Sequence, residues 1–225
     1  MNQGENIMSE HKVKIEDKIL NEIKGMFQSI ETDVTLHMFT RKDHCLLCNE
    51  TLDLVQQVAT QSDKVQLKLC ECDINSEEAK KWKIERHPAI VVEGQSKGLI
   101  RFYGIPSGYE FGSLIESIIM SGKTNGSDLE PELVEEIKAI DKPLHLQVFV
   151  TPTCPYCPTA VLNAFKLAML NENITADMIE ATEFQELSMK YQVQGVPKTV
   201  INDSWDVVGG VPPQALMEKV RLALN

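Results

Sequence analysis

Two stretches of alternating apolar and polar residues mark the strands around which this chain is organised. Residues 34–39 (VTLHMF) and 144–149 (LHLQVF) alternate with the period of two that is typical of a β-strand. Each is followed by a helical pattern, a second apolar strand and a short helix. These elements are helices over residues 46–61, 77–83, 158–170 and 184–191, and strands over residues 65–70 and 174–179. Two further strands and a closing helix complete each series, which predicts an α/β fold with the order β-α-β-α-β-β-α repeated twice.

The two series repeat at a fixed distance along the chain. Cys154 lies 109 residues after Cys45, and Pro197 lies 109 residues after Pro88. The residues that follow the two prolines, AIVV and KTVI, are β-branched strand sequences, and a Gly-x-Pro turn then leads into the last helix of each series. Because this period is longer than that of solenoid repeats, it indicates a duplicated domain.

The segments outside the repeat suggest where the two units begin and end. Residues 13–30 have apolar positions at helical spacing and predict an added N-terminal helix. Residues 121–132 are polar and rich in turn residues, which is typical of a linker, and residues 133–140 predict a short helix. We therefore expect an N-terminal unit over residues 1–122 and a C-terminal unit over residues 123–225.

Composition and charge narrow the classes of function. The chain has 225 residues, 43% of them hydrophobic, and a formal net charge of -11 at pH 7. An acidic surface repels phosphate backbones and anionic lipids, so neither nucleic acid nor membrane is expected as a partner. The opening residues are polar and contain no apolar signal core, and no apolar run is long enough to span a bilayer. These features predict a cytoplasmic protein.

The six cysteines are the strongest chemical signal in the chain. In a cytoplasmic protein, cysteines indicate catalysis or metal binding more often than structural disulfides. Cys45 and Cys48 form one C-x-x-C pair (CLLC), Cys154 and Cys157 form a second (CPYC), and residues 70–72 contain a C-x-C pair. Both C-x-x-C pairs stand where a strand ends and a helix is predicted to begin.

This position predicts a role for each cysteine of the two pairs. A thiolate, rather than a thiol, attacks a disulfide, and a helix N-terminus lowers a cysteine pKa through its unpaired N–H groups and the positive end of its dipole. Cys45 and Cys154 are therefore the predicted nucleophiles. Cys48 and Cys157 return about one helical turn later and are the predicted resolving cysteines. We expect no cofactor and no metal beyond these redox-active cysteine pairs.

The motifs resemble a known family. CPYC after an apolar strand, with GVPKTVI downstream, resembles the glutaredoxin and thioredoxin superfamily. Two such units in one chain, each with its own C-x-x-C pair, are similar to the protein disulfide oxidoreductases described from archaea and thermophilic bacteria. The resemblance implies tandem thioredoxin/glutaredoxin-like units that share one continuous mixed β-sheet flanked by helices, with a cis-proline, Pro88 or Pro197, in each unit. The backbone before each proline, at His87 and Val196, would then be free to pair with an extended substrate.

The resemblance also implies the function of a protein thiol–disulfide oxidoreductase. Reduction, oxidation and isomerisation of protein disulfides use the same residues, and the reduction potential selects among them. We expect protein dithiols and disulfides as substrates, with a thioredoxin reductase as electron donor and a peroxiredoxin as a further partner. Gly209-Gly210 is followed by Val211-Pro212-Pro213, whereas glutathione-binding glutaredoxins carry an acidic or polar residue there. This departure favours protein thiols as the electron source.

Other interpretations remain open from the sequence. A double unit of this kind also occurs as the electron-shuttle module of alkyl hydroperoxide reductases, where the first unit's cysteines are lost. A metal-binding or scaffold protein could use the fold without catalysis, although the two C-x-x-C pairs are too far apart for a ribbon-type zinc site. One unit could be an inactive copy, but each retains both of its cysteines.

The C-x-C pair and two histidines have less certain roles. Cys70 and Cys72 end the second strand of the first unit on the same side, where the second unit has isoleucine and alanine. We expect buried free thiols, with a C-x-C disulfide or an auxiliary redox relay as the alternatives. His44 precedes Cys45 and His87 precedes Pro88, so either could favour the first thiolate; the alternatives are a solvated loop residue for His44 and a packing residue for His87.

Overall fold

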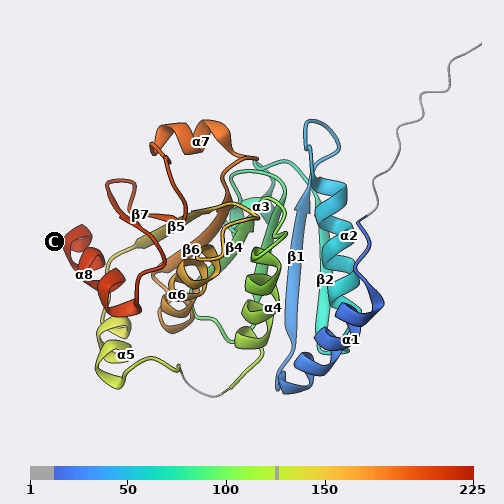
Figure 1. The fold of residues 1–225 in the computed structure, drawn as a ribbon, viewed down its shortest axis with the longest axis horizontal. Coiled ribbons are helices and arrows are strands. Elements are labelled where there is room, and N and C mark those ends of the chain that lie inside the picture. The colour runs from blue at the N-terminus through green and yellow to red at the C-terminus, as the bar shows by residue number, and fades with distance from the viewer. Residues whose placement is uncertain (1–12, 125–126) are drawn as a thin grey trace, which may run out of the picture.

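The computed structural model describes residues 13–124 and 127–225, which fold around one eight-stranded sheet (Figure 1). The strands lie in the order β2-β1-β3-β4-β6-β5-β7-β8. They are β1 Val34–Thr40, β2 Val65–Glu71, β3 Ala89–Glu93, β4 Leu99–Tyr103, β5 Leu144–Val150, β6 Ile174–Glu180, β7 Lys198–Ile201 and β8 Trp205–Val208. The helices are α1 Asp17–Met26, α2 Cys48–Ala59, α3 Glu77–Lys81, α4 Glu110–Ser121, α5 Pro131–Lys138, α6 Cys157–Leu170, α7 Gln185–Lys190 and α8 Pro213–Leu224.

The same strand arrangement occurs twice within this sheet. β1 pairs in parallel with β2 and antiparallel with β3, which pairs antiparallel with β4. β5 pairs in the same way with β6 and β7, and β7 with β8. The two halves join through parallel pairing of β4 with β6, from Leu99 opposite Thr175 to Tyr103 opposite Ile179. This confirms the α/β fold class, the element order and the single continuous mixed sheet.

Helices cover the two faces of the sheet unequally. The larger core lies under α1, α2, α4, α5, α6 and α8, and includes Leu54, Leu114 and Phe165. The smaller core lies on the other face under α3 and α7, and includes Phe39 and Trp82. In Figure 1, α2, α4 and α6 lie in front of the sheet, whereas α3 lies behind it. Because side chains alternate along a strand, each interior strand contributes apolar residues to both cores.

Position in the sheet explains why equivalent strands differ in burial. β1 and β5 are interior strands and are buried along almost their whole length. β2 lies at an edge, and most of its residues are exposed or half-buried. Its counterpart β6 is buried throughout except at one residue, because β4 of the first unit covers its outer side. The duplicated sequence pattern therefore leaves β2 at an open edge of the sheet and pairs β6 with β4. We call this β4–β6 pairing, which joins the two units, the seam.

A buried ion pair crosses this seam. Arg101 on β4 stands opposite Asp177 on β6 and donates to its carboxylate from Nε at 2.7 Å and from Nη2 at 2.8 Å. His145 Nε2 lies 2.6 Å from the same carboxylate. Burial alone would raise the pKa of Asp177, but the Arg101 guanidinium and the hydrogen bond from His145 outweigh it and lower the pKa to about 2. The sequence pattern gave no indication of this pairing.

Some predicted boundaries differ from the observed ones. The N-terminal helix is shorter than residues 13–30: α1 ends at Met26 and a 3-10 turn follows. The predicted linker, residues 121–132, overlaps the last residue of α4 and the start of α5. Its residues 125 and 126 lie outside the described residues, as do residues 1–12 of the predicted first unit. The predicted division between residues 122 and 123 falls in the connection from α4 to α5.

Candidate redox-active sites

The two C-x-x-C pairs lie at the same edge of the sheet. β1 and β5 run in the same direction, because two antiparallel pairings and two parallel pairings connect them. Cys45 comes after the end of β1 and Cys154 after the end of β5, so both pairs lie beyond the carboxyl ends of these strands. Since β3, β4 and β6 stand between β1 and β5, four strand spacings of about 4.8 Å place the strand ends about 19 Å apart.

The first pair forms a disulfide between Cys45 and Cys48, with Cα atoms 5.5 Å apart. Cys48 is the first residue of α2 and is 4% exposed, whereas Cys45 is half-buried in the turn before the helix. Leu46, between them, is 86% exposed. Thr51 fixes the start of the helix, because its N–H and its hydroxyl both donate to the Leu47 carbonyl, at 2.9 and 2.6 Å. Cys45 is thus the more accessible cysteine of this pair.

The second pair has the same arrangement. Cys154 and Cys157 form a disulfide with Cα atoms 5.5 Å apart. Cys157 is the first residue of α6 and is fully buried, whereas Cys154 lies in the preceding turn and retains 8% exposure. The Sγ atom of Cys154 lies 3.7 Å from the carbonyl oxygen of Val196. The predicted nucleophile of the second unit therefore lies against the residue that precedes Pro197.

In both units the helix begins at the second cysteine rather than before it. The pattern placed the start of α2 at Leu46, but the helix begins at Cys48, and Cys45 occupies the turn in front of it. The first N–H groups of a helix have no acceptor within the helix, so they still favour negative charge in that turn. The assignment of Cys45 and Cys154 as nucleophiles, and of Cys48 and Cys157 as resolving cysteines, stays a prediction.

Both prolines of the repeat lie next to a cysteine pair. The His87–Pro88 and Val196–Pro197 peptide bonds are cis, as the resemblance implied. Each proline directly precedes a strand, β3 or β7, that is antiparallel to the strand leading into the cysteine pair. The structure thus brings one proline to each site. A substrate-binding role for these four residues stays a prediction.

His87 lies between the first site and the C-x-C pair. Its ring contacts the backbone of Cys72, and its Nε2 atom is buried without a hydrogen-bond partner among residues 13–124 and 127–225. Burial lowers the pKa of His87, and the positive charge of Arg41 lowers it further. The ring is therefore mostly neutral at neutral pH and supplies little charge to a thiolate. His44 is exposed, with a φ of 58°, which fits the alternative of a solvated loop residue.

A buried carboxyl group lies near the second site. Glu110 begins α4 and is 1% exposed, and neither of its carboxyl oxygens has a partner within the described ranges. Burial raises its pKa to about 7. Next to it, the Tyr109 N–H donates to the carbonyl of Pro152, which leads into the second pair, at 3.0 Å. A glutamate in a first helical turn is usually exposed, where it favours the helix dipole, so the sequence pattern did not reveal this group.

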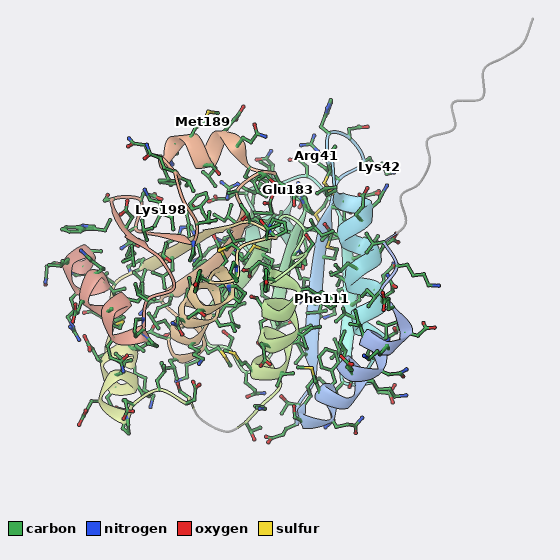
Figure 2. The ribbon with its side chains drawn as sticks, in the orientation of Figure 1. Arg41, Lys42, Phe111, Glu183, Met189 and Lys198 are labelled. Atoms are coloured by element: carbon green, nitrogen blue, oxygen red, sulfur yellow. A yellow bond between two sulfur atoms is a disulfide. The ribbon has the colours of Figure 1, made fainter. Side chains whose placement is uncertain are left out.

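A second carboxyl group with a raised pKa lies where the two units meet. Glu183 accepts a hydrogen bond from the Ile105 N–H at 2.6 Å and donates its own N–H to Glu180 at 2.6 Å. Burial raises the pKa of Glu183 to about 7, and the carboxylates of Glu180 and Glu50 add to this effect. Figure 2 shows Glu183 between α7 and the loop that carries Arg41. Acidic groups therefore occupy the edge between the two cysteine pairs.

The C-x-C pair differs from the predicted free buried thiols. Cys70 and Cys72 form a disulfide with Cα atoms 5.5 Å apart. Both residues are half-buried and pack against the smaller core. The prediction of burial was wrong because β2 is an edge strand without a neighbour on its outer side. The prediction of free thiols was wrong because the two sulfurs are paired with each other.

The described residues form neither a membrane-spanning helix nor a cluster of metal ligands. Across residues 13–124 and 127–225, no helix is both long and apolar enough to cross a membrane. In the same part of the chain, no group of three or more His, Cys, Asp or Glu side chains is placed to hold a metal ion.

Comparison with known proteins identifies the superfamily of this chain. A model of the thioredoxin domain matches residues 144–221, which include the second cysteine pair. The NTD_N/C domain of alkylhydroperoxide reductase AhpF from Enterococcus faecalis (V583) has a TM-score of 0.83 at 26% identity, over 91% of this chain and 99% of that chain. A protein disulfide oxidoreductase from Aeropyrum pernix K1 also has a TM-score of 0.83 at 26% identity, over 94% of each chain. The chain belongs to the thioredoxin superfamily. It is a tandem member of that superfamily, and each of its two units carries a C-x-x-C pair.

Curated relatives of this superfamily member are longer proteins. An alkyl hydroperoxide reductase component from Staphylococcus epidermidis is 31% identical over 140 residues, which is 61% of this chain and 27% of that protein. The NADH dehydrogenase of Bacillus subtilis is 25% identical over 191 residues, which is 84% of this chain and 34% of that protein. The chain thus spans about a third or less of the length of these relatives.

Proposed function

We propose that this chain is a protein thiol–disulfide oxidoreductase with two active dithiols. One observation carries the proposal: each unit of the thioredoxin-type sheet has a C-x-x-C pair at the start of a helix and a cis-proline directly before the neighbouring strand. A scaffold or metal-binding role does not require this arrangement twice. Thiol–disulfide exchange uses every one of these features in both units.

The proposed reaction has two exchange steps at each site. The thiolate of Cys45 or Cys154 attacks a substrate disulfide, which forms a mixed disulfide and releases one substrate thiolate. Cys48 or Cys157 then attacks the mixed disulfide, closes the enzyme disulfide and releases the second substrate thiolate. One disulfide breaks and one forms, so two electrons pass from enzyme to substrate. The reverse sequence oxidises a substrate dithiol.

Exposed apolar side chains around the pairs support protein substrates. Leu46 within the first pair is 86% exposed, and Tyr156 within the second is 71% exposed. Tyr109, which contacts the loop of the second pair from the first unit, is 54% exposed. Clusters of exposed aromatic and aliphatic side chains are typical of protein-binding surfaces. We propose that protein disulfides and dithiols bind here, that a thioredoxin reductase supplies the electrons, and that the protein works in the cytoplasm.

A double substitution tests the proposed function. Cys45→Ser with Cys154→Ser should reduce the rate of dithiothreitol-driven insulin reduction to the rate without enzyme, because both nucleophiles are lost. Each single variant should keep the activity of the other site. Circular dichroism and thermal unfolding of all three variants check that they fold. Near wild-type activity in the double variant would reject both nucleophile assignments.

A second candidate function is electron transfer to a peroxidase. The similarity to the AhpF domain over 91% of this chain favours it specifically. Under this candidate, a reductase reduces the chain, which then reduces a peroxiredoxin. Peroxide-dependent NADPH oxidation, measured with thioredoxin reductase, a peroxiredoxin and this chain, tests it. Turnover of peroxide without insulin reduction would favour the shuttle, and insulin reduction without peroxide turnover would favour the general oxidoreductase.

A further inference from the structure

A third cysteine pair lies beside the first site and takes no part in the function proposed above. Cys70 is in β2 and Cys72 follows the strand, and a disulfide joins them. Their counterparts in the second unit are Ile179, which is fully buried, and Ala181. The equivalence is direct: the Cys72 N–H donates to the end of β1 at 3.0 Å, and the Ala181 N–H donates to the end of β5 at 2.9 Å. The first unit thus has a half-buried disulfide where the second has a fully buried isoleucine and a half-buried alanine.

Two contacts connect this pair to the loop that carries the first site. The Cys72 N–H donates to the carbonyl of Thr40, the last residue of β1. Lys42 Nζ lies 3.3 Å from a carboxylate oxygen of Glu71, the residue between the two cysteines, and Figure 2 shows Lys42 on the loop after β1. Cys45 is five residues after Thr40. Since an extended chain covers at most about 3.6 Å per residue, its Cα lies within about 18 Å of Thr40.

The repeat also connects the third pair to the first site through His87. In the second unit, the sulfur of Cys154 lies 3.7 Å from the carbonyl of Val196, the residue before the cis-proline. His87 is the residue before the cis-proline in the first unit. His87 is thus the first unit's counterpart of Val196, and its ring lies near the backbone of Cys72. His87 therefore belongs both to the cis-proline turn of the first unit and to the surroundings of the third pair.

We propose that Cys70 and Cys72 form a third redox-active pair that exchanges electrons with Cys45 and Cys48. The reduced first pair starts the exchange: the Cys45 thiolate attacks one sulfur of the Cys70–Cys72 disulfide and releases the other as a thiolate. Cys48 then attacks the mixed disulfide, closes the Cys45–Cys48 disulfide and releases the second thiolate. One disulfide breaks and one forms. Two electrons and two protons pass from the first pair to the third, so no outside reagent is needed. The inference rests on the proposed function only in requiring that the first pair cycles between dithiol and disulfide.

Trapping the mixed disulfide tests this inference. A variant with Cys48, Cys72, Cys154 and Cys157 replaced by serine retains Cys45 and Cys70, and a companion variant retains Cys45 and Cys72. After oxidation with oxidised glutathione, the monomer is digested with trypsin without reduction. Cleavage after Lys64 and Lys68 separates the two remaining cysteines into different peptides. We expect a linked pair of peptides as the main product in at least one variant.

A matched control sets the background for this experiment. A variant that retains only Cys154 and Cys70 has its two cysteines on β2 and beyond β5, five strand spacings or about 24 Å apart, and should form no intrachain link. Circular dichroism checks that all three variants fold. Linkage at the control level in both test variants would overturn the inference. The Cys45–Cys70 or Cys45–Cys72 link can form even if the wild-type protein does not reduce insulin. The experiment therefore distinguishes failure of this inference from failure of the proposed oxidoreductase function.

A kinetic measurement provides a second test on nearly intact protein. Oxidised wild type and Cys45→Ser are mixed with equimolar dithiothreitol, and alkylation with mass spectrometry follows the thiols of Cys70 and Cys72 over time. Reduction of this pair should slow by about tenfold in Cys45→Ser, because only direct attack by the small dithiol remains. Equal rates in the two proteins would contradict transfer through the first pair.

Discussion

The ion pair on the seam between the two units offers a sharp test of how the sheet is held together. Replacing Asp177 by asparagine keeps the size of the side chain but removes its charge. The Asp177 side chain is fully buried and that of Arg101 is 2% exposed, so both charges are shielded from solvent. The substitution therefore leaves the guanidinium without its carboxylate partner, and the backbone carbonyls of Trp82 and Lys83 remain as uncharged acceptors.

Two estimates bracket the cost of this substitution. Removing one partner of a buried ion pair typically lowers the free energy of unfolding by about 3–5 kcal/mol. The lowered pKa of Asp177, from 3.8 to about 2, corresponds to about 2–3 kcal/mol of stabilisation of the charged form. The second estimate is smaller because it includes only the stabilisation of the Asp177 charge. It leaves out the cost of burying the Arg101 charge without a carboxylate partner. We expect a loss of about 3 kcal/mol, which lowers Tm by roughly 6–12 °C in a chain of this size.

Equilibrium unfolding in urea, followed by circular dichroism, measures this loss. Glu136→Gln is the matched control, because it also breaks a two-bond contact with an arginine, Arg221, but at an exposed position. The control should lose much less stability, since exposed ion pairs are screened by solvent. Equal losses in Asp177→Asn and Glu136→Gln would refute the argument that the buried pair holds the seam.

The same pair predicts an acid dependence with a definite sign. The pKa of Asp177 is lower in the folded chain than in the unfolded chain, so its stabilisation is fully present above about pH 4. It is lost as the pH falls through the folded pKa of about 2. Between pH 4 and pH 2, wild type should therefore lose more stability than Asp177→Asn. Parallel acid profiles of the two proteins would show that Asp177 is not the responsible carboxyl group.

Two further predictions concern the segment that supports the second site. Gly108→Ala should lower the stability by about 1–2 kcal/mol and weaken second-site activity in a Cys45→Ser background, because Gly108 has a φ of +60° and a Cβ there would meet the Pro152 carbonyl at 2.1 Å. Gly112→Ala is the control: Gly112 lies within α4, just after this turn, and a Cβ there would meet nothing within 4 Å, so this variant should be more stable than wild type in urea unfolding. Wild-type stability should fall as the pH rises from about 4.5 to about 7, because Glu110 ionises in the unfolded chain over this range but stays protonated in the folded chain. Glu110→Gln should abolish this fall. Identical pH profiles of wild type and Glu110→Gln in urea unfolding would contradict the prediction.

Much of the fold follows from local sequence pattern. Alternation over residues 34–39 and 144–149 predicted β1 and β5, and the common spacing of Cys45 to Cys154 and of Pro88 to Pro197 revealed the duplication. These signals are local or repeat along one chain, so they need no knowledge of the packed structure. The family resemblance then supplied the continuous sheet and the cis peptide bonds.

The features that were missed depend on which strand lies next to which. Arg101 and Asp177 come from different units, and only the pairing of β4 with β6 brings them together. Glu110 is a common residue for a helix start, and its local sequence does not indicate that its side chain is buried. Cys70 was misjudged because the repeat treats β2 and β6 as equivalent, whereas only one of them is an edge strand.

The separation of the two C-x-x-C pairs limits how they can cooperate. Disulfide exchange requires sulfur atoms to approach to about 2 Å, whereas the strands that lead into the two pairs end about 19 Å apart on one hydrogen-bonded sheet. Cys45 and Cys154 therefore cannot form a bond with each other while the sheet is intact. Electrons can move between the sites only on a carrier, and an extended polypeptide of about six residues is long enough to reach from one to the other. The sheet thus sets how far apart two cysteines of a single bound partner must lie if both are to react at the same time, one at each site.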